Sequence, residues 1–132
     1  MKRFIPLFAL VVLSACTVYN VEPRYDSRDK ITGSYDVEEY SHTWNDNTYY
    51  TMRIVKSGSD YSDIYIRNFY GADIEVYAYV NYDKITIPYQ VVDGYEVEGT
   101  GTIYGSRMEM NYSVRDTYEY TETDFCEMTA WR

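Results

Sequence analysis

The chain has 132 residues, with 21 acidic against 12 basic side chains, two cysteines, and 18 tyrosines against four phenylalanines and two tryptophans. This length fits one domain, because domains run to roughly 100–200 residues, and it excludes a two-domain enzyme. The formal charge of −9 would repel a phosphate backbone, so nucleic acid is not an expected partner. With 45% apolar and 18% aromatic residues, the chain carries too much apolar surface for an intrinsically disordered protein.

Residues 1–15 have the composition of a secretory signal peptide. Two basic residues precede the apolar run Phe4–Leu13, and the small residues Ser14 and Ala15 follow it. The apolar run is too short to span about 30 Å of hydrocarbon as a helix that rises about 1.5 Å per residue. We therefore expect this segment to be cleaved.

The sequence Leu13-Ser14-Ala15-Cys16 resembles the lipobox of bacterial lipoproteins. The resemblance implies cleavage before Cys16, attachment of lipid to its thiol, and acylation of the new amino terminus. Two or more acyl chains would make this anchor stable, because each buried CH₂ contributes only about 0.8 kcal/mol. The alternative is an ordinary cleavable signal with Cys16 merely nearby. Cleavage removes two basic residues, which changes the formal charge from −9 to −11.

Residues 16–30 mix both charges with one proline and show no sustained hydrophobic period. They predict a lipidated N-terminus and flexible tether that leads to a domain over residues 31–132. If lipid occupies Cys16, Cys126 has no partner for an intrachain disulfide. Apolar residues lie close to Cys126 on both sides in the sequence. Because an unpaired cysteine is usually a buried small hydrophobe, we expect Cys126 to be buried.

From Ile31 onward, apolar and polar residues alternate, which is the mark of strands with one buried face. Eight such segments are expected, the first at about Gly33–Tyr40 and the others around residues 51–55, 64–67, 74–80, 85–90, 97–103, 108–114 and 126–130. No window has the period of a convincing amphipathic helix. The sequence therefore predicts an all-β domain.

Turn signals between these segments favour strands joined in sequence order. Asp93-Gly94 is the strongest, since a type I′ turn requires positive φ at both central positions. Pro88 lacks a donor for the ladder, so its strand should be short, bulged or at an edge. Gly99 and Gly101 share one face, where the absence of side chains would let a small barrel bend or close. The pattern favours an antiparallel up-and-down meander of about eight strands.

Residues 31–132 resemble the small lipocalin-like lipoproteins of Bacteroidetes. The resemblance rests on the segments Ile31-Thr32-Gly33-Ser34-Tyr35, Ile85-Thr86-Ile87-Pro88-Tyr89-Gln90, Gly99-Thr100-Gly101 and Met110-Asn111-Tyr112-Ser113-Val114. The opening is similar to the Gly-x-Trp that begins the first strand of lipocalins, with Tyr35 in place of tryptophan. The resemblance implies a lipocalin-like barrel with a ligand cavity, and an arginine, Arg115 or Arg132, across that aromatic ring. It implies no activity, since a fold does not determine a function.

The sequence offers no pattern typical of catalysis or metal binding. His42 is the only histidine, and the HExxH, CxxC and P-loop motifs are absent. Carboxylates are so numerous that the sequence cannot single out the pair that a glycosidase would need. We therefore expect a protein that is not an enzyme and that holds neither a metal nor a cofactor.

The leading hypothesis is a lipid-anchored binding lipoprotein of the bacterial cell envelope, with a small or apolar ligand inside the barrel. The side chains expected to line that cavity are Met52, Ile54, Ile64, Ile66, Val76, Ala78, Met108 and Met110. A small barrel can also be filled by its own side chains, which would leave no cavity. Lipoproteins exported to the surface in that phylum carry an acidic run after the lipidated cysteine. The run is absent after Cys16, so we expect an anchor in the outer membrane that faces the periplasm, with exposure at the cell surface as the alternative.

The alternative is a non-catalytic structural or interaction lipoprotein that binds a protein or a glycan. Four tyrosines oppose the phase of the apolar face and would lie outside a barrel: Tyr49, Tyr65, Tyr77 and Tyr79. A tyrosine ring is flat and apolar with a polar tip, a combination used at interfaces and for stacking on sugars. The same pattern would also arise in a partly wet sheet face with no partner. A third hypothesis is an inhibitor of an envelope enzyme that binds through its loops.

Overall fold

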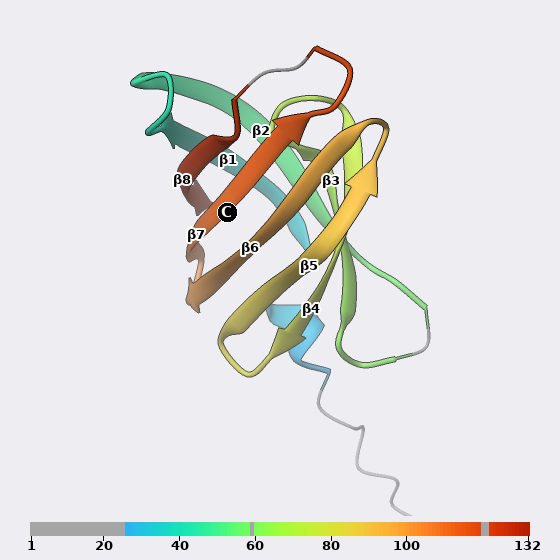
Figure 1. Ribbon diagram of the computed structural model, residues 1–132. Helices are drawn as coiled ribbons and strands as arrows, with labels where there is room; N and C mark the ends of the chain where they lie inside the picture. Colours follow the sequence, from blue (N-terminus) through green and yellow to red (C-terminus); the bar gives the residue numbers. More distant parts are fainter. Residues whose placement is uncertain (1–25, 59, 120–121) are drawn as a thin grey trace, which may run out of the picture.

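A computed structural model describes residues 26–58, 60–119 and 122–132 (Figure 1). Each antiparallel strand pairs with the next along the chain, and the last pairs with the first to close a barrel. The elements are the 3-10 helix η1 (Ser27–Lys30) and the strands β1 (Gly33–Ser41), β2 (Asp46–Lys56), β3 (Asp63–Phe69), β4 (Ile74–Asn81), β5 (Lys84–Val92), β6 (Tyr95–Tyr104), β7 (Arg107–Asp116) and β8 (Asp124–Trp131). The predicted all-β meander of eight strands is confirmed. Among the described residues, no helix is long and apolar enough to cross a membrane.

Alternation determines which side chains enter the barrel. Along β4 the four apolar residues Ile74, Val76, Ala78 and Val80 are buried, and the residues between them are exposed or half-buried. Successive side chains of a strand point to opposite faces, so each strand contributes one apolar row to a shared core. The predicted turn at Asp93-Gly94 has φ of 48° and 83° at its two central residues, as a type I′ turn requires.

Pro88 and Gly99 each shape the wall of the barrel as the sequence predicts. On β5 the register shifts between Ile87 and Gln90, so Pro88 and Tyr89 both lie opposite Glu98 of β6. This β-bulge accommodates a proline that has no N–H to donate. On β6, a Cβ added to Gly99 would lie 2.4 Å from the Cβ of its partner on β7, so only glycine allows the two strands to approach this closely.

The folded domain begins earlier than the sequence suggests. Asp26 caps η1, and Arg28 is 4% exposed. The Arg28 guanidinium donates hydrogen bonds to Asp26 and to the carbonyl oxygens of Ser57 and Asp63, both at 3.0 Å. The predicted tether over residues 16–30 is therefore wrong for residues 26–30, which pack on the barrel. The rest of that segment, including the predicted lipidation site Cys16, lies outside the described residues.

The barrel has two ends with different elements. The end that we call the base carries η1, the β2–β3, β4–β5 and β6–β7 connections and the C-terminus. The end that we call the mouth carries the β1–β2, β3–β4, β5–β6 and β7–β8 connections. Figure 1 shows η1 beside the end of β4 at the base, with the β7–β8 connection at the opposite end. The described chain therefore enters the barrel at the base.

Candidate functional site

The eight side chains predicted to line a ligand cavity all point into the barrel. Each is at most 1% exposed: Met52, Ile54, Ile64, Ile66, Val76, Ala78, Met108 and Met110. An enclosed cavity would leave their surfaces open to a water-sized sphere, so values this low mean that they fill the space between them. They form part of one hydrophobic core. The expected ligand cavity among these eight residues is therefore wrong, and close packing is the physical reason.

The four predicted tyrosines do not form one face. Tyr65 of β3 and Tyr77 of β4 are cross-strand partners with ring centroids 6.3 Å apart, and Tyr79 follows on β4. Tyr49 lies six residues along β2 from the residue that pairs with Tyr65. At about 3.3 Å per residue, this places Tyr49 about 20 Å along the strand from the Tyr65–Tyr77 pair, and Tyr79 lies further away still. The predicted interaction face is therefore reduced to three tyrosines, and the Tyr77 hydroxyl donates to Asp63 at 2.7 Å.

The lipocalin resemblance leaves two candidates for the arginine across the Tyr35 ring, and the structure places Arg132 there. The guanidinium of Arg132 lies 5.9 Å from the centroid of the buried Tyr35 ring. Arg132 also donates a hydrogen bond to the carbonyl oxygen of Thr32 at 3.1 Å. Arg115 instead forms an ion pair with Glu96 on the outer face of the barrel, at 2.9 Å. Arg132 is thus the residue that covers the aromatic ring at the base.

Two buried carboxylates meet at the mouth. Glu39 of β1 is 4% exposed, and Asp124 of β8 is 5% exposed. Glu39 accepts hydrogen bonds from the hydroxyl groups of Tyr112 and Tyr50, the latter at 2.9 Å. Asp124 accepts hydrogen bonds from the hydroxyl groups of Ser41 and Tyr70. We call the set Glu39, Ser41, Tyr50, Tyr70, Tyr112 and Asp124 the mouth cluster.

Burial dominates the electrostatics of the mouth cluster. It raises the pKa of Glu39 to about 7, a rise that the nearby Asp124 carboxylate increases and the hydrogen bond from Tyr50 limits. Burial also raises the pKa of Cys126, which is 3% exposed as the sequence predicts, and the Glu39 and Asp124 charges add to this rise. The cluster therefore holds a carboxyl group that changes charge near neutral pH.

A pocket of about 270 Å³ lies over this cluster and opens at the mouth. Its aromatic side chains are Trp44 of the β1–β2 turn, Tyr70 of the β3–β4 turn and Tyr95 of β6. The Tyr70 and Tyr95 rings are tilted by 60° with centroids 6.3 Å apart. Its carboxylates belong to Asp116, Glu119, Glu122 and Asp124, and Val114 completes the lining. The described residues that line this pocket include no lysine, arginine or histidine.

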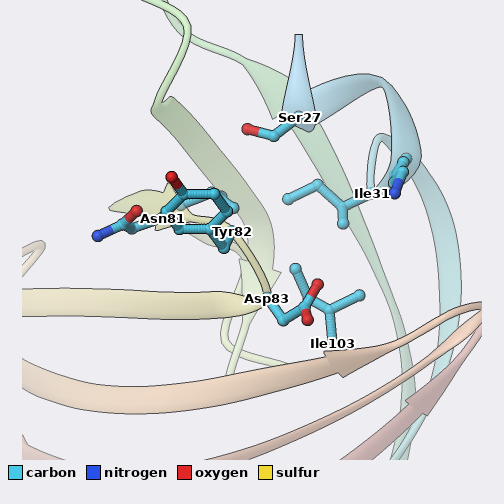
Figure 2. Close-up of a pocket in the computed structure, with 8 residues that line it drawn as sticks. Ser27, Ile31, Asn81, Tyr82, Asp83 and Ile103 are labelled. Atoms are coloured by element: carbon cyan, nitrogen blue, oxygen red, sulfur yellow. The ribbon is translucent and has the colours of Figure 1, made fainter. Parts of the chain in front are cut away.

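Two further hollows have different linings. Figure 2 shows a crevice of about 400 Å³ at the base, where Ser27 and Ile31 face the β4–β5 turn and Ile103. This crevice results from the packing of η1 against the barrel. A shallow groove of about 570 Å³ crosses the outer face of β5, β6, β7 and β8.

The sequence missed the mouth cluster, although it contains a signal. Glu39 and Ser41 share the inward phase of β1 with Val37, and Asp124 shares the inward phase of β8 with Cys126. Polar residues in an apolar row are unusual, because a buried polar group needs a partner. The signal is incomplete in the sequence, because Ser41 and Asp124 lie just outside the predicted strands over residues 33–40 and 126–130.

The fold defines a closed, eight-stranded antiparallel meander barrel of the lipocalin-like kind. Comparison of the sequence with protein-family models and with curated proteins finds no match to this chain.

Proposed function

We propose that the protein is a lipid-anchored lipoprotein of the bacterial cell envelope that binds a small organic cation at the mouth of its barrel and catalyses no reaction. The observation that carries this proposal is the mouth pocket, where three aromatic rings and four carboxylates surround about 270 Å³. Because side chains fill the interior of the barrel, a ligand would bind at the end of the barrel.

The chemistry of the pocket favours a positively charged ligand with an apolar surface. A cation within about 6 Å of the face of a tryptophan or tyrosine ring is stabilised by about 0.5–2 kcal/mol. The pocket offers such rings on Trp44, Tyr70 and Tyr95, with carboxylates between them. An alkylammonium group would contact the rings with its methylene or methyl groups while its charge is balanced by the carboxylates.

The mouth cluster would couple ligand binding to a proton. Glu39 has a pKa near 7, so it is partly protonated at neutral pH. A cation in the pocket above would favour the ionised carboxylate, because opposite charges at short distance lower the pKa of an acid. Binding would therefore release a fraction of a proton, and affinity would rise with pH through this range.

The position of the described N-terminus supports an orientation for the anchored protein. Asp26 and η1 lie at the base, so a lipid on Cys16 would attach the protein to the membrane from that end. The mouth would then face away from the membrane. The lipobox at Leu13–Cys16 supports the anchor, and Arg132 over Tyr35 supports the lipocalin resemblance. We propose the outer membrane, with the periplasm as the compartment that the mouth faces.

Calorimetric titration of the purified full chain with choline tests the ligand class. The control ligand is 3,3-dimethylbutan-1-ol, which has the same shape without the charge. We expect choline to bind and the neutral alcohol not to bind. Trp44→Ala should weaken choline binding about tenfold, because it removes one ring of the pocket.

Trp131→Ala is the matched control variant, since Trp131 has similar exposure, 44% against 53%, but lies at the end of β8 toward the base. Equal binding of choline and the alcohol, no binding of choline, or equal losses in the two tryptophan variants would contradict the proposed ligand site. Mass spectrometry of the chain isolated from bacterial membranes tests the anchor separately. We expect an acylated Cys16 at the N-terminus, and an intact signal peptide would contradict it.

A further inference from the structure

The groove on the outer face of β5–β8 is larger than the mouth pocket and lies on a different surface of the barrel. Two exposed aromatic side chains flank a floor of polar ones: Tyr89 of β5, 60% exposed, and Phe125 of β8, 57% exposed. Glu98 and Ser113 lie in the cross-strand row between these two residues, and Thr86, Thr100 and Asn111 form the neighbouring row. The imidazole of His42 also lines the groove.

The hollow has a structural cause in the strands beneath it. Thr86, Thr100 and Asn111 form one cross-strand row over β5, β6 and β7, and all three have short side chains. Gly99 lets the β6 and β7 backbones approach closely between the rows. The β-bulge at Pro88 and Tyr89 reorients Tyr89 relative to a regular strand.

The separation of the two aromatic side chains suits an extended ligand. They belong to strands that are three strand spacings apart in the barrel. With about 4.8 Å between neighbouring strands, the two walls stand about 14 Å apart. A ligand that contacts both rings must therefore be longer than a single sugar or amino acid.

We propose that this groove binds an uncharged oligosaccharide. The ring faces of Tyr89 and Phe125 would stack on the apolar faces of sugar rings. The hydroxyl groups of Thr86, Thr100 and Ser113 and the amide of Asn111 both donate and accept hydrogen bonds, as sugar hydroxyls do. Glu98, also part of the lining, adds a carboxylate acceptor.

The charge of the protein and its strand pairing argue against other ligands of similar length. A formal charge of −9 and the carboxylate of Glu98 would repel a uronic acid or a sulfated sugar. An extended peptide usually binds by adding to a free strand edge. The floor strands β6 and β7 are both paired on their two sides, so they offer no such edge.

The test is calorimetric titration of the full chain with four neutral hexasaccharides: maltohexaose, cellohexaose, xylohexaose and chitohexaose. We expect at least one to bind, and Tyr89→Ala and Phe125→Ala each to weaken its binding about tenfold. Thr100→Arg should also weaken binding, because it fills the floor while both rings remain. Tyr104→Ala is the matched control, since Tyr104 is 50% exposed and lies at the base end of β6.

Thermal unfolding of each variant shows whether it is folded, and removal of an exposed ring should leave the midpoint nearly unchanged. The inference is overturned if none of the four sugars binds, or if hexagalacturonate binds as well as they do. It is also overturned if folded Tyr89→Ala, Phe125→Ala and Thr100→Arg all bind like the wild type. Trp44→Ala should bind the sugar normally, which separates this site from the mouth pocket.

Discussion

The two ends of the barrel each bury carboxylates, but they neutralise them in opposite ways. At the base, Asp26 lies against the guanidinium of Arg28 at 2.9 Å and the ammonium of Lys56 at 3.1 Å. The hydrogen bond from Arg28 holds the pKa of Asp26 well below its usual range. At the mouth, Glu39 receives hydrogen bonds from tyrosine hydroxyls, and its pKa is raised to about 7.

The two ends therefore differ in whether a positive charge lies beside the buried carboxylate. At the base, the guanidinium of Arg28 neutralises the carboxylate of Asp26. Its hydrogen bonds to the carbonyl groups of Ser57 and Asp63 also hold η1 against the barrel. Among the described residues, the hydrogen-bond donors to Glu39 at the mouth are tyrosine hydroxyl groups, which carry no counter-charge. This difference is the reason why we propose a cationic ligand at the mouth and not at the base.

The largest expected effect comes from removing the cation at the base. Arg28→Ala leaves the carboxylate of Asp26 with one partly exposed partner and two carbonyl groups without their donor. We expect the free energy of unfolding at neutral pH to fall by about 3–5 kcal/mol, as when one member of a buried pair is removed. Urea denaturation measures it. Lys56→Ala is the control, with an expected loss below about 1 kcal/mol, and an equal loss in both variants would contradict a special role for Arg28.

The next effect is a pH dependence that comes from the mouth. The pKa of Glu39 is raised in the folded state, so between about pH 4.5 and pH 7 the folded protein binds this proton more tightly than the unfolded chain. Stability from this group is therefore present at low pH and lost as pH rises. We expect a loss of about 2–3 kcal/mol between about pH 5 and about pH 8, measured by urea denaturation.

At the base, the pH dependence of stability has the opposite sign. Because the pKa of Asp26 is lowered by folding, its contribution to stability is present above about pH 4 and is lost in acid.

Two variants test whether Glu39 causes the loss of stability at higher pH. Glu39→Gln should remove the decline above about pH 5, since the amide is neutral at every pH and its oxygen still accepts hydrogen bonds. Glu38→Gln, a change in the adjacent outward-facing residue, is the control and should keep the decline. A decline that survives Glu39→Gln would assign it to another group.

The smallest effect concerns the arginine over Tyr35. Arg132→Ala removes a cation–π contact and one hydrogen bond to a backbone carbonyl, so we expect a loss of about 1 kcal/mol. Arg115→Ala breaks an exposed ion pair and should cost less than about 0.5 kcal/mol. Thermal unfolding of the two variants side by side gives the comparison. A larger loss in the Arg115 variant would contradict the assignment of Arg132 to this position.

The sequence predicts the walls of the barrel well because strand burial has a period of two residues. That period alone predicts the strand from Ile74 to Val80, and the bulge at Pro88 follows from a missing N–H. The chemistry of the ends depends on contacts between residues far apart in the chain. Glu39 approaches Tyr112 only after β8 has joined β1 to β7, and Arg28 finds its acceptors 29 and 35 residues away.

The same limit applies to the predicted site residues. Strand phase correctly predicts that the eight side chains point inward, but whether they enclose a cavity depends on how closely they pack. Tyr49 shares its phase with Val55, but phase does not show which residue of β2 pairs with Tyr65. The register shows that this residue is Val55, six residues along the strand from Tyr49. Phase gives the face of a side chain, and the register between strands gives its neighbours.

The most direct test of this comparison is a pH titration of the carboxyl groups of Glu39 and Asp26 by carbon-detected NMR. We predict that Glu39 titrates near pH 7, that Asp26 stays ionised far below its usual range, and that choline lowers the pKa of Glu39 without affecting Asp26. An ordinary pKa of about 4.5 for Glu39, or a choline response at Asp26 instead of Glu39, would contradict the account.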